Sequence, residues 1–165
     1  MSEGLGLYGQ LLLPLLVANG APVILQWVMK EQGGWPVDGG RVMPLDGRRW
    51  LGRSITWRGL ASAVLATGVA AVSLNLPFAI GLEAGAWAMA GDLLSSFIKR
   101  RLNLAPGDMA LGLDQIPESL LPLLAIAGEA RLEVKAIASL VLVFIVLELL
   151  LSRLLYALEI RERPY

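Results

Sequence analysis

Residues that could do chemistry gather near the middle of the chain, at the end of an otherwise apolar stretch. Asp92 is followed by Ser96 and by Lys99-Arg100-Arg101, and Asp114 lies further along. In a helix, Ser96 would lie about one turn and Lys99 about two turns after Asp92 on the same face. Such a set can gather a divalent cation and phosphate oxygens where a membrane meets water. The pattern indicates nucleotide transfer onto a lipid phosphate.

The composition is that of a membrane protein. Hydrophobic residues make up 56% of the 165 residues, charged residues only 17%, and mean hydropathy is +0.63, which is too apolar for a water-soluble domain. The sequence contains no Cys and no His. Thiolate nucleophiles, Cys/His metal sites and a His base are therefore excluded, and carboxylates and hydroxyls remain as ligands for a hard cation such as Mg²⁺. Net charge is zero, which gives no sign of a nucleic-acid partner.

Five apolar stretches predict an all-α integral membrane protein, with about five transmembrane helices in a single domain, 1–165. Most of them have the ~20 residues that a helix needs to cross the hydrocarbon. The fourth is the weakest, because prolines and polar residues lie in its first half, and a kinked or partly re-entrant helix is the alternative. The stretches run from about Leu5 to Met29, Leu60 to Ile80, Leu82 to Lys99, Met109 to Gly128 and Ala136 to Leu158.

Basic residues are distributed asymmetrically around these stretches. With the N-terminus outside, twelve of the fourteen Lys and Arg fall on the inner side, and only Arg131 and Lys135 fall outside. This predicts a multi-pass protein of the inner (cytoplasmic) membrane with its polar motifs facing the cytoplasm. The one long connection, from Lys30 to Trp57, is rich in Gly, Pro and Asp-Gly steps, so we expect cytoplasmic turns or a short hairpin there.

The central motif resembles the signature of the CDP-lipid synthases (phosphatidate cytidylyltransferases), which has a Gly-Asp, a Ser four residues after the Asp, a Lys-Arg pair and a later Asp. Within that superfamily the whole chain is most similar to the short CDP-archaeol synthase family. The long connection adds elements similar to that family's Pro-x-Asp, Asp-Gly-x-Arg and Lys-Thr-Trp-Arg-Gly. The motif 19–22, Asn-Gly-Ala-Pro, also resembles the family and would break the first helix. The resemblance covers roughly residues 15 to 125.

This resemblance implies a CTP-dependent lipid-phosphate cytidylyltransferase of phospholipid biosynthesis. The enzyme would transfer CMP from CTP to a lipid phosphate, either an unsaturated archaeol phosphate-like lipid or phosphatidate, to give a CDP-lipid and pyrophosphate. Mg²⁺ is the implied cofactor, the bilayer is the other partner, and a homodimer is left open. The implied catalytic residues are Asp92, Ser96, Lys99, Arg100 and Asp114, with Asp92 and Asp114 as metal ligands; the implied substrate-binding residues are Asn19, Asp38, Asp46, Arg48, Thr56 and Arg58.

Two positions depart from the family pattern. Pro117 stands where the second acidic motif has its second Asp, and the adjacent Glu118 is a candidate substitute as a third metal ligand. Ile55 stands where the family has a Lys. Glu83 and Glu148 match no motif, and we interpret them as hydrogen-bonding groups between helices. The alternative functions are a small membrane transporter and a non-catalytic membrane scaffold assembled through Gly81-x-x-x-Gly85.

Overall fold

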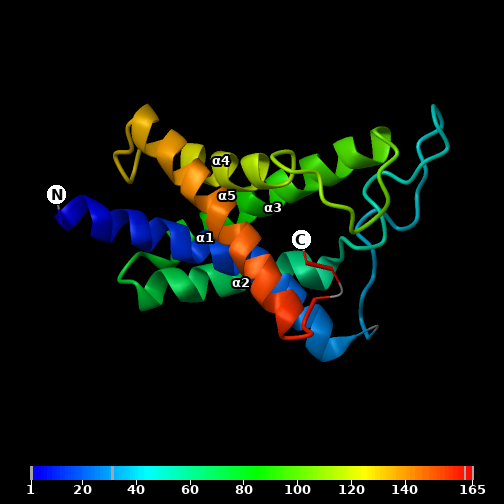
Figure 1. The fold of residues 1–165 in the computed structure, drawn as a ribbon, viewed down its shortest axis with the longest axis horizontal. Helices are drawn as coiled ribbons and strands as arrows, with labels where there is room; N and C mark the ends of the chain where they lie inside the picture. Colours follow the sequence, from blue (N-terminus) through cyan, green and yellow to red (C-terminus); the bar gives the residue numbers. More distant parts are fainter. Residues whose placement is uncertain (1, 31, 162, 165) are drawn as a thin grey trace.

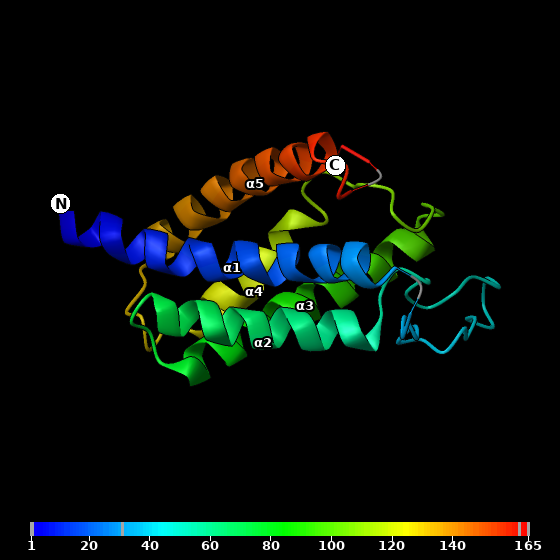
Figure 2. The ribbon, with the colours of Figure 1, turned by 90° about the horizontal axis from the view of Figure 1, so that it is seen from below.

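The computed structural model describes residues 2–30, 32–161 and 163–164, and within these ranges it is helical, with isolated bridges but no strand. Helices α1 to α4 lie roughly along one axis, and α5 crosses them obliquely (Figures 1 and 2). The connection between α1 and α2 and the connection between α3 and α4 are at one end, and the N-terminus is at the other. The helices are α1 (Ser2–Met29), α2 (Trp57–Ser73), α3 (Phe78–Arg101), α4 (Gln115–Ala125) and α5 (Val134–Ala157).

Two helices are long and apolar enough to cross a membrane by themselves: α1, over Tyr8–Met29, and α5, over Val134–Ala157. Helix α2 is apolar but shorter. Helix α4 has 11 residues, which at 1.5 Å per residue is about 17 Å, well short of the ~30 Å hydrocarbon core. The apolar stretch from Met109 to Gly128 is therefore not one continuous helix, and it is the stretch for which a kinked or partly re-entrant helix was the alternative. Turns occupy its first part, where Gly112 has a φ of 81° that favours glycine.

The boundary between α2 and α3 also differs from the hydropathy pattern. We expected the break near Ile80, whereas α2 ends at Ser73 and α3 begins at Phe78. Asn75 adopts a left-handed φ of 61°, a conformation that Asn tolerates better than most residues. Pro77 then precedes the first turn of α3, where a missing N–H costs nothing. The residues on both sides of this turn are apolar, so hydropathy averaged over many residues does not show the break between the two helices.

Helix α1 is continuous, although the motif 19–22 predicted a break. Pro14 and Pro22 both lie inside the helix. Each proline removes one backbone hydrogen bond, and the remaining bonds on either side keep the helix together when neighbouring helices pack against it. The packing is extensive around Leu15, which is 1% exposed and shares a core with Leu123 of α4 and Phe144 of α5.

Helices α2 and α3 approach each other through glycine. A Cβ added at Gly81 would lie 2.7 Å from the Thr67 carbonyl oxygen and 2.8 Å from the Gly68 Cα, and one added at Gly85 would lie 2.9 Å from the Val64 Cα. Small residues permit such backbone contact between membrane helices. The Gly81-x-x-x-Gly85 pair is thus already occupied by α2 of the same chain, so it is not available to assemble a scaffold as that alternative required.

Candidate functional site

The centre of the site is a close contact between α3 and α4 at Gly91. A Cβ added at Gly91 would lie 2.4 Å from the Pro117 carbonyl oxygen and 2.6 Å from the Glu118 backbone nitrogen. Only glycine lets the two backbones meet in this way. The backbone at Pro117 and Glu118 therefore packs directly on α3. The contact also brings Asp92, the next residue of α3, beside the first turn of α4.

The predicted central residues lie together at this contact. The Ser96 hydroxyl interacts with the Asp92 carboxylate one turn before it, and the charges of Asp92, Asp114, Glu118 and Lys99 act on one another. Lys99 Nζ lies 2.7 Å from Asp114 Oδ1, and Asp114 Oδ2 accepts a hydrogen bond of 3.0 Å from the Ala110 backbone N–H. We refer to Asp92, Ser96, Lys99, Asp114 and Glu118 as the acidic cluster.

The cationic side chains of Lys99 and Arg100, in the last turn of α3, are buried, although cations at the end of a membrane helix can remain exposed to water. Lys99 is 9% exposed and Arg100 is 6% exposed. Lys99 also donates to the Asp108 carbonyl oxygen, and Arg100 Nη2 donates to the Ala105 carbonyl oxygen at 3.0 Å. Arg100 Nε has no hydrogen-bond partner among the described residues. Both side chains therefore turn toward the 102–114 connection, which carries Asp114.

Asp38, a predicted substrate-binding residue, organises the long connection. Its carboxylate pairs with Arg49 and accepts hydrogen bonds from the backbone N–H groups of Gly40, Leu51 and Gly52, at 3.0, 3.3 and 3.0 Å. Burial alone would raise the pKa of Asp38, but these hydrogen bonds outweigh burial and hold the pKa well below its ordinary value. The carboxylate is thus fully engaged within its own loop.

This arrangement predicts a pH-dependent contribution of Asp38 to stability. Because the folded-state pKa is lowered, the stabilisation is present above the ordinary carboxyl pKa of ~4 and is lost as pH falls below it. We expect Asp38→Asn to lower the thermal midpoint at pH 7 and to flatten its dependence between about pH 5 and pH 3. Thermal unfolding of purified protein in detergent measures both. Glu129→Gln, at an exposed position, is the control, and parallel pH curves for wild type and Asp38→Asn would contradict the assignment.

Asp46 and Arg48 fasten the long connection to the C-terminal end of α3. Arg48 Nη1 donates to the Arg101 carbonyl oxygen at 2.8 Å, and Asp46 Oδ1 pairs with Arg101 Nη1 at 3.0 Å. The Arg101 guanidinium also lies 5.1 Å from the centre of the Phe97 ring. Arg48 therefore caps the end of α3, since its last carbonyls lack helical partners, and Asp46 holds the Arg101 side chain.

The remaining predicted substrate-binding residues lie at helix ends or inside α1. Thr56 is the N-cap of α2, and its Oγ1 accepts a hydrogen bond from the Gly59 N–H at 3.2 Å. Arg58 donates to the Gln26 side chain and to the Lys30 carbonyl oxygen, which joins α2 to the end of α1. Asn19 Nδ2 is buried, with no hydrogen-bond partner among the described residues.

Ile55 is 6% exposed, and its carbonyl oxygen accepts a hydrogen bond from the Val37 N–H at 3.0 Å. A lysine at position 55 would therefore have its Cα and the base of its side chain at a buried point of the chain.

Sequence reasoning missed two polar residues of this region. Gln115 is 2% exposed, and it joins Gly112 to Glu148 of α5. Arg49 is the partner of Asp38, and counting Asp-Gly-x-Arg from Asp46 places the arginine at 49. For Arg49 a local signal therefore existed, whereas the pairing of Gln115 with Glu148 joins residues 33 apart and has no local signal.

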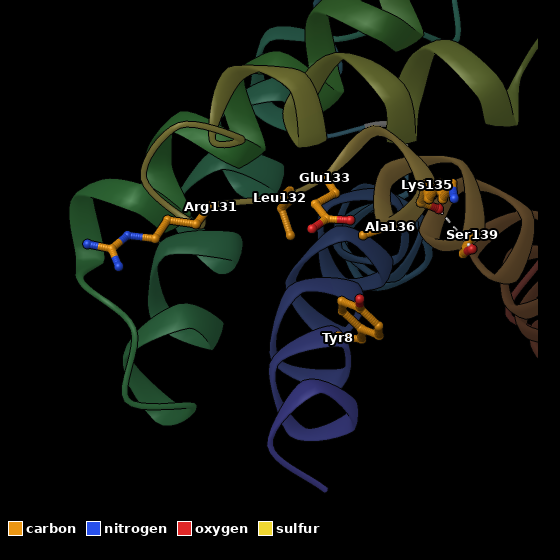
Figure 3. A pocket seen from close by; sticks show the side chains of 7 residues that line it. All are labelled: Tyr8, Arg131, Leu132, Glu133, Lys135, Ala136 and Ser139. Carbon is orange, nitrogen blue, oxygen red and sulfur yellow. Dashed lines mark hydrogen bonds between the residues drawn. The ribbon is translucent and has the colours of Figure 1, made fainter. Parts of the chain in front are cut away.

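A pocket of about 340 Å³ lies between the start of α5 and the N-terminal half of α1 (Figure 3). Tyr8, Arg131, Glu133 and Lys135 line it. The start of α5 lies at the end of the bundle away from the long connection (Figure 2). This pocket is therefore separate from the acidic cluster.

The acidic cluster has the ligand types that a magnesium ion shared with a substrate would need. Among the described residues, no group of three or more acidic side chains is arranged so that it could hold a metal ion by itself. Mg²⁺, however, is usually held by one or two carboxylates and completes its coordination with water and substrate phosphates. Asp114 Oδ1 is buried and forms an ion pair with the Lys99 ammonium at 2.7 Å. A cation-binding oxygen is thus present beside Asp92.

Comparison with known proteins shows which family the chain resembles. The family model described as CarS-like, CDP-archaeol synthase, matches residues 7–165. The chain is 43% identical over 114 residues to the CDP-archaeol synthase of Pyrococcus furiosus, an alignment that covers 63% of this chain and 64% of that protein. It is 37% identical over 165 residues to that of Sulfurisphaera tokodaii, covering 93% and 92%.

The fold has a solved counterpart as well. A structure described as "an intramembrane enzyme for archaeal membrane lipids biosynthesis" superposes with a TM-score of 0.65 at 32% identity and covers 87% of this chain and 90% of that one. The chain spans less than two thirds of the length of the Pyrococcus furiosus protein. The family model matches nearly the whole sequence, including the segments of α3 and α4 that carry the acidic cluster. The chain therefore belongs to the CDP-archaeol synthase family.

Proposed function

We propose that this protein is a membrane cytidylyltransferase that transfers CMP from CTP to a lipid phosphate, giving a CDP-lipid and pyrophosphate. The observation that carries the proposal is the Gly91 contact, which places the Asp92 face of α3 against the first turn of α4. Carboxylates, a hydroxyl and cations from separate stretches are thereby gathered in one cluster. An archaeol-type phosphate is the substrate favoured by the named relatives, and phosphatidate is the alternative.

In this reaction an oxygen of the lipid phosphate attacks the α-phosphorus of CTP. The new phosphorus–oxygen bond forms as the bond from the α-phosphorus to the oxygen bridging to the β-phosphate breaks, and pyrophosphate leaves with that electron pair. The lipid phosphate is already a nucleophile, so no base is required. The protein has to hold two polyanions together and neutralise the charge that builds on the leaving group. Lys99 and Arg100 supply positive charge for this purpose.

Asp92 and Asp114 are the residues that would hold Mg²⁺, with Glu118 as a candidate third ligand. The ion would supply charge neutralisation and a template for the phosphates. Asp92 would be kept in place by Ser96 one turn later on α3. Asp114 would be kept in place by the Ala110 N–H, so each ligand has a partner on its own segment.

We propose further that all five helices are embedded in the cytoplasmic membrane, with the acidic cluster toward the cytoplasm. Helix α4 would enter only part of the way, because its 11 residues cover about 17 Å. The 102–114 connection that precedes it has turns rather than helix. Irregular backbone is tolerated at membrane depth where it lines a polar cavity, which suits a site that receives both CTP and a lipid headgroup.

The direct test is to incubate purified protein in detergent with CTP, Mg²⁺ and a panel of lipid phosphates, including archaeol-type ether phosphates, phosphatidate and polyprenyl phosphate. We expect pyrophosphate and a CDP-lipid to appear in equal amounts, with the ether phosphate preferred. CTP with the dephosphorylated lipid is the control. Absence of product with every lipid phosphate would overturn the proposal.

The role of Glu118 is tested through the Mg²⁺ requirement. If Glu118 faces the metal, Glu118→Gln removes one metal-facing charge and should raise the Mg²⁺ concentration for half-maximal rate. If it only provides favourable charge in the first turn of α4, the change should cost at most about 1 kcal/mol of stability and leave the requirement alone. Titration of Mg²⁺ at saturating CTP, with thermal unfolding of the same samples, distinguishes the two.

Orientation can be read by cysteine labelling, because the chain contains no cysteine of its own. We expect a membrane-impermeant maleimide to label Glu129→Cys, in the α4–α5 connection, on intact cells. Ser54→Cys, in the long connection, should react only after the cells are opened. Both positions are exposed, so they form a matched pair. Labelling of both from outside would contradict the orientation.

A further inference from the structure

Glu148 lies on α5, outside the acidic cluster, yet both of its carboxylate oxygens have partners. Oε2 accepts a hydrogen bond of 3.1 Å from Gln115 Nε2, and Oε1 accepts one of 3.0 Å from Ser152 Oγ. Arg161 Nη1 lies 3.8 Å from the same Oε1 and donates to Ser152 Oγ at 2.6 Å. The expectation that Glu148 makes hydrogen bonds between helices is therefore confirmed. The Glu148 side chain is 13% exposed, so these contacts are largely shielded from water.

The partner on the other helix is Gln115, which directly follows Asp114. The Gln115 Oε1 atom accepts a hydrogen bond of 2.8 Å from the Gly112 N–H, while its Nε2 donates to Glu148. One buried amide thus joins α5 to the turn that precedes Asp114. Because Asp114 lies between these two anchored residues, its direction toward Asp92 depends on the same contacts.

The C-terminal tail holds the middle of this connection. Arg163 pairs with the Asp108 side chain, and Asp108 accepts hydrogen bonds from the Ala105 N–H at 2.9 Å and, through its carbonyl oxygen, from Lys99 Nζ. Figure 2 shows the C-terminus beside the end of the bundle where the 102–114 connection lies. Arg163 therefore holds the connection near its middle, and α5 holds the end that leads into α4.

From these contacts we infer that Glu148 is a positioning residue for Asp114, acting through Gln115, in the reaction proposed above. The hydrogen bonds and ion pair of Glu148 among the described residues go to Gln115, Ser152 and Arg161, and its charge also acts on Glu118 of the acidic cluster. Its contribution is to fix the turn from which Asp114 projects. This inference rests on the proposed function for its kinetic consequences, but the anchoring of the connection can be measured without turnover.

The kinetic test compares Glu148→Leu, Glu148→Gln and Gln115→Leu. We expect Glu148→Leu to raise the Mg²⁺ concentration for half-maximal rate by about fivefold, the factor typical of one lost hydrogen bond. Glu148→Gln, which keeps an acceptor for Gln115, should stay close to wild type. Gln115→Leu, which also loses the Gly112 contact, should raise this concentration at least as much as Glu148→Leu. The double variant should be no worse than Gln115→Leu, because the contact with Glu148 is then already absent. Glu83→Leu, an exposed acid on α3, is the control.

An independent readout uses the single-cysteine variant Ala110→Cys, at a half-buried position of the connection. We expect its maleimide labelling in detergent to accelerate by about fivefold when Glu148→Leu is added and to stay unchanged with Glu148→Gln. Unchanged labelling with Glu148→Leu would overturn the inference. So would a double variant whose change in the Mg²⁺ concentration for half-maximal rate is the product of the changes in the two single variants. Absence of CMP transfer in the wild type would instead count against the proposed function, and the labelling result would still stand.

Discussion

Asp92→Asn is expected to abolish CMP transfer while the protein remains folded in detergent. The substitution keeps the size of the side chain and removes the charge that would face the metal and the phosphates. Turnover above about a tenth of wild type would correspond to a loss below ~1.4 kcal/mol, too little for a principal metal ligand. The measurement is the initial rate of CDP-lipid formation across a range of Mg²⁺ concentrations, together with thermal unfolding. Asp114→Asn should behave in the same way.

The matched control is Glu83→Gln. Glu83 lies on the same helix as Asp92 but is exposed, so its neutralisation should leave the rate unchanged. If Asp92→Asn instead retains most of its activity and loses stability, Asp92 is a structural residue that pairs with Lys99. The comparison separates chemistry from packing, because both variants remove one carboxylate from α3.

The second large effect is expected at Gly91. A methyl group at this position would overlap the Pro117 carbonyl oxygen and the Glu118 nitrogen, both of which are backbone atoms and cannot rotate away. Gly91→Ala should therefore force α3 and α4 apart, at a cost of about 1–3 kcal/mol or more. We expect a lower thermal midpoint and, because Asp114 moves with α4, loss of most of the transfer activity. Thermal unfolding and initial rates measure the two effects.

Gly9→Ala in α1 is the matched control for this substitution. A Cβ at Gly9 meets no atom within 4 Å, and alanine favours a helix over glycine by about 1 kcal/mol. Gly9→Ala should therefore be neutral or stabilising. Wild-type stability and activity in Gly91→Ala would show that the helices can yield at this contact, and the description of the site would then be wrong.

The sequence predicted the part of the site that follows from local geometry. Helical spacing placed Ser96 and Lys99 on the face of Asp92, and in the structure both interact with that carboxylate. The long connection was expected to have turns, and it contains turns and the isolated bridges Pro36 to Thr56 and Val42 to Arg49. Both features depend only on residues close in sequence, where backbone geometry fixes which side chains can meet.

The features that could not be predicted depend on contacts between distant segments. The closeness of Gly91 to Pro117 requires α4 to pack on α3, and hydropathy alone does not give its direction or its length. The roles of Asp46 and Arg48 at the end of α3 were also hidden, because motif matching assigns a charged loop residue to substrate. A charged side chain can equally satisfy the free carbonyls at a helix end.

The glycine contact between α2 and α3 has a consequence for how the protein is made. Only residues 74–77 connect the two helices, and their backbones touch at Gly81 and Gly85. Contacts between segments that are close in sequence form early and with little loss of chain entropy. We expect this pair to assemble as a hairpin during synthesis, before the ribosome has made α4. The side of the site that carries Asp92 would then form first, and the segment with Asp114 would be added to it later.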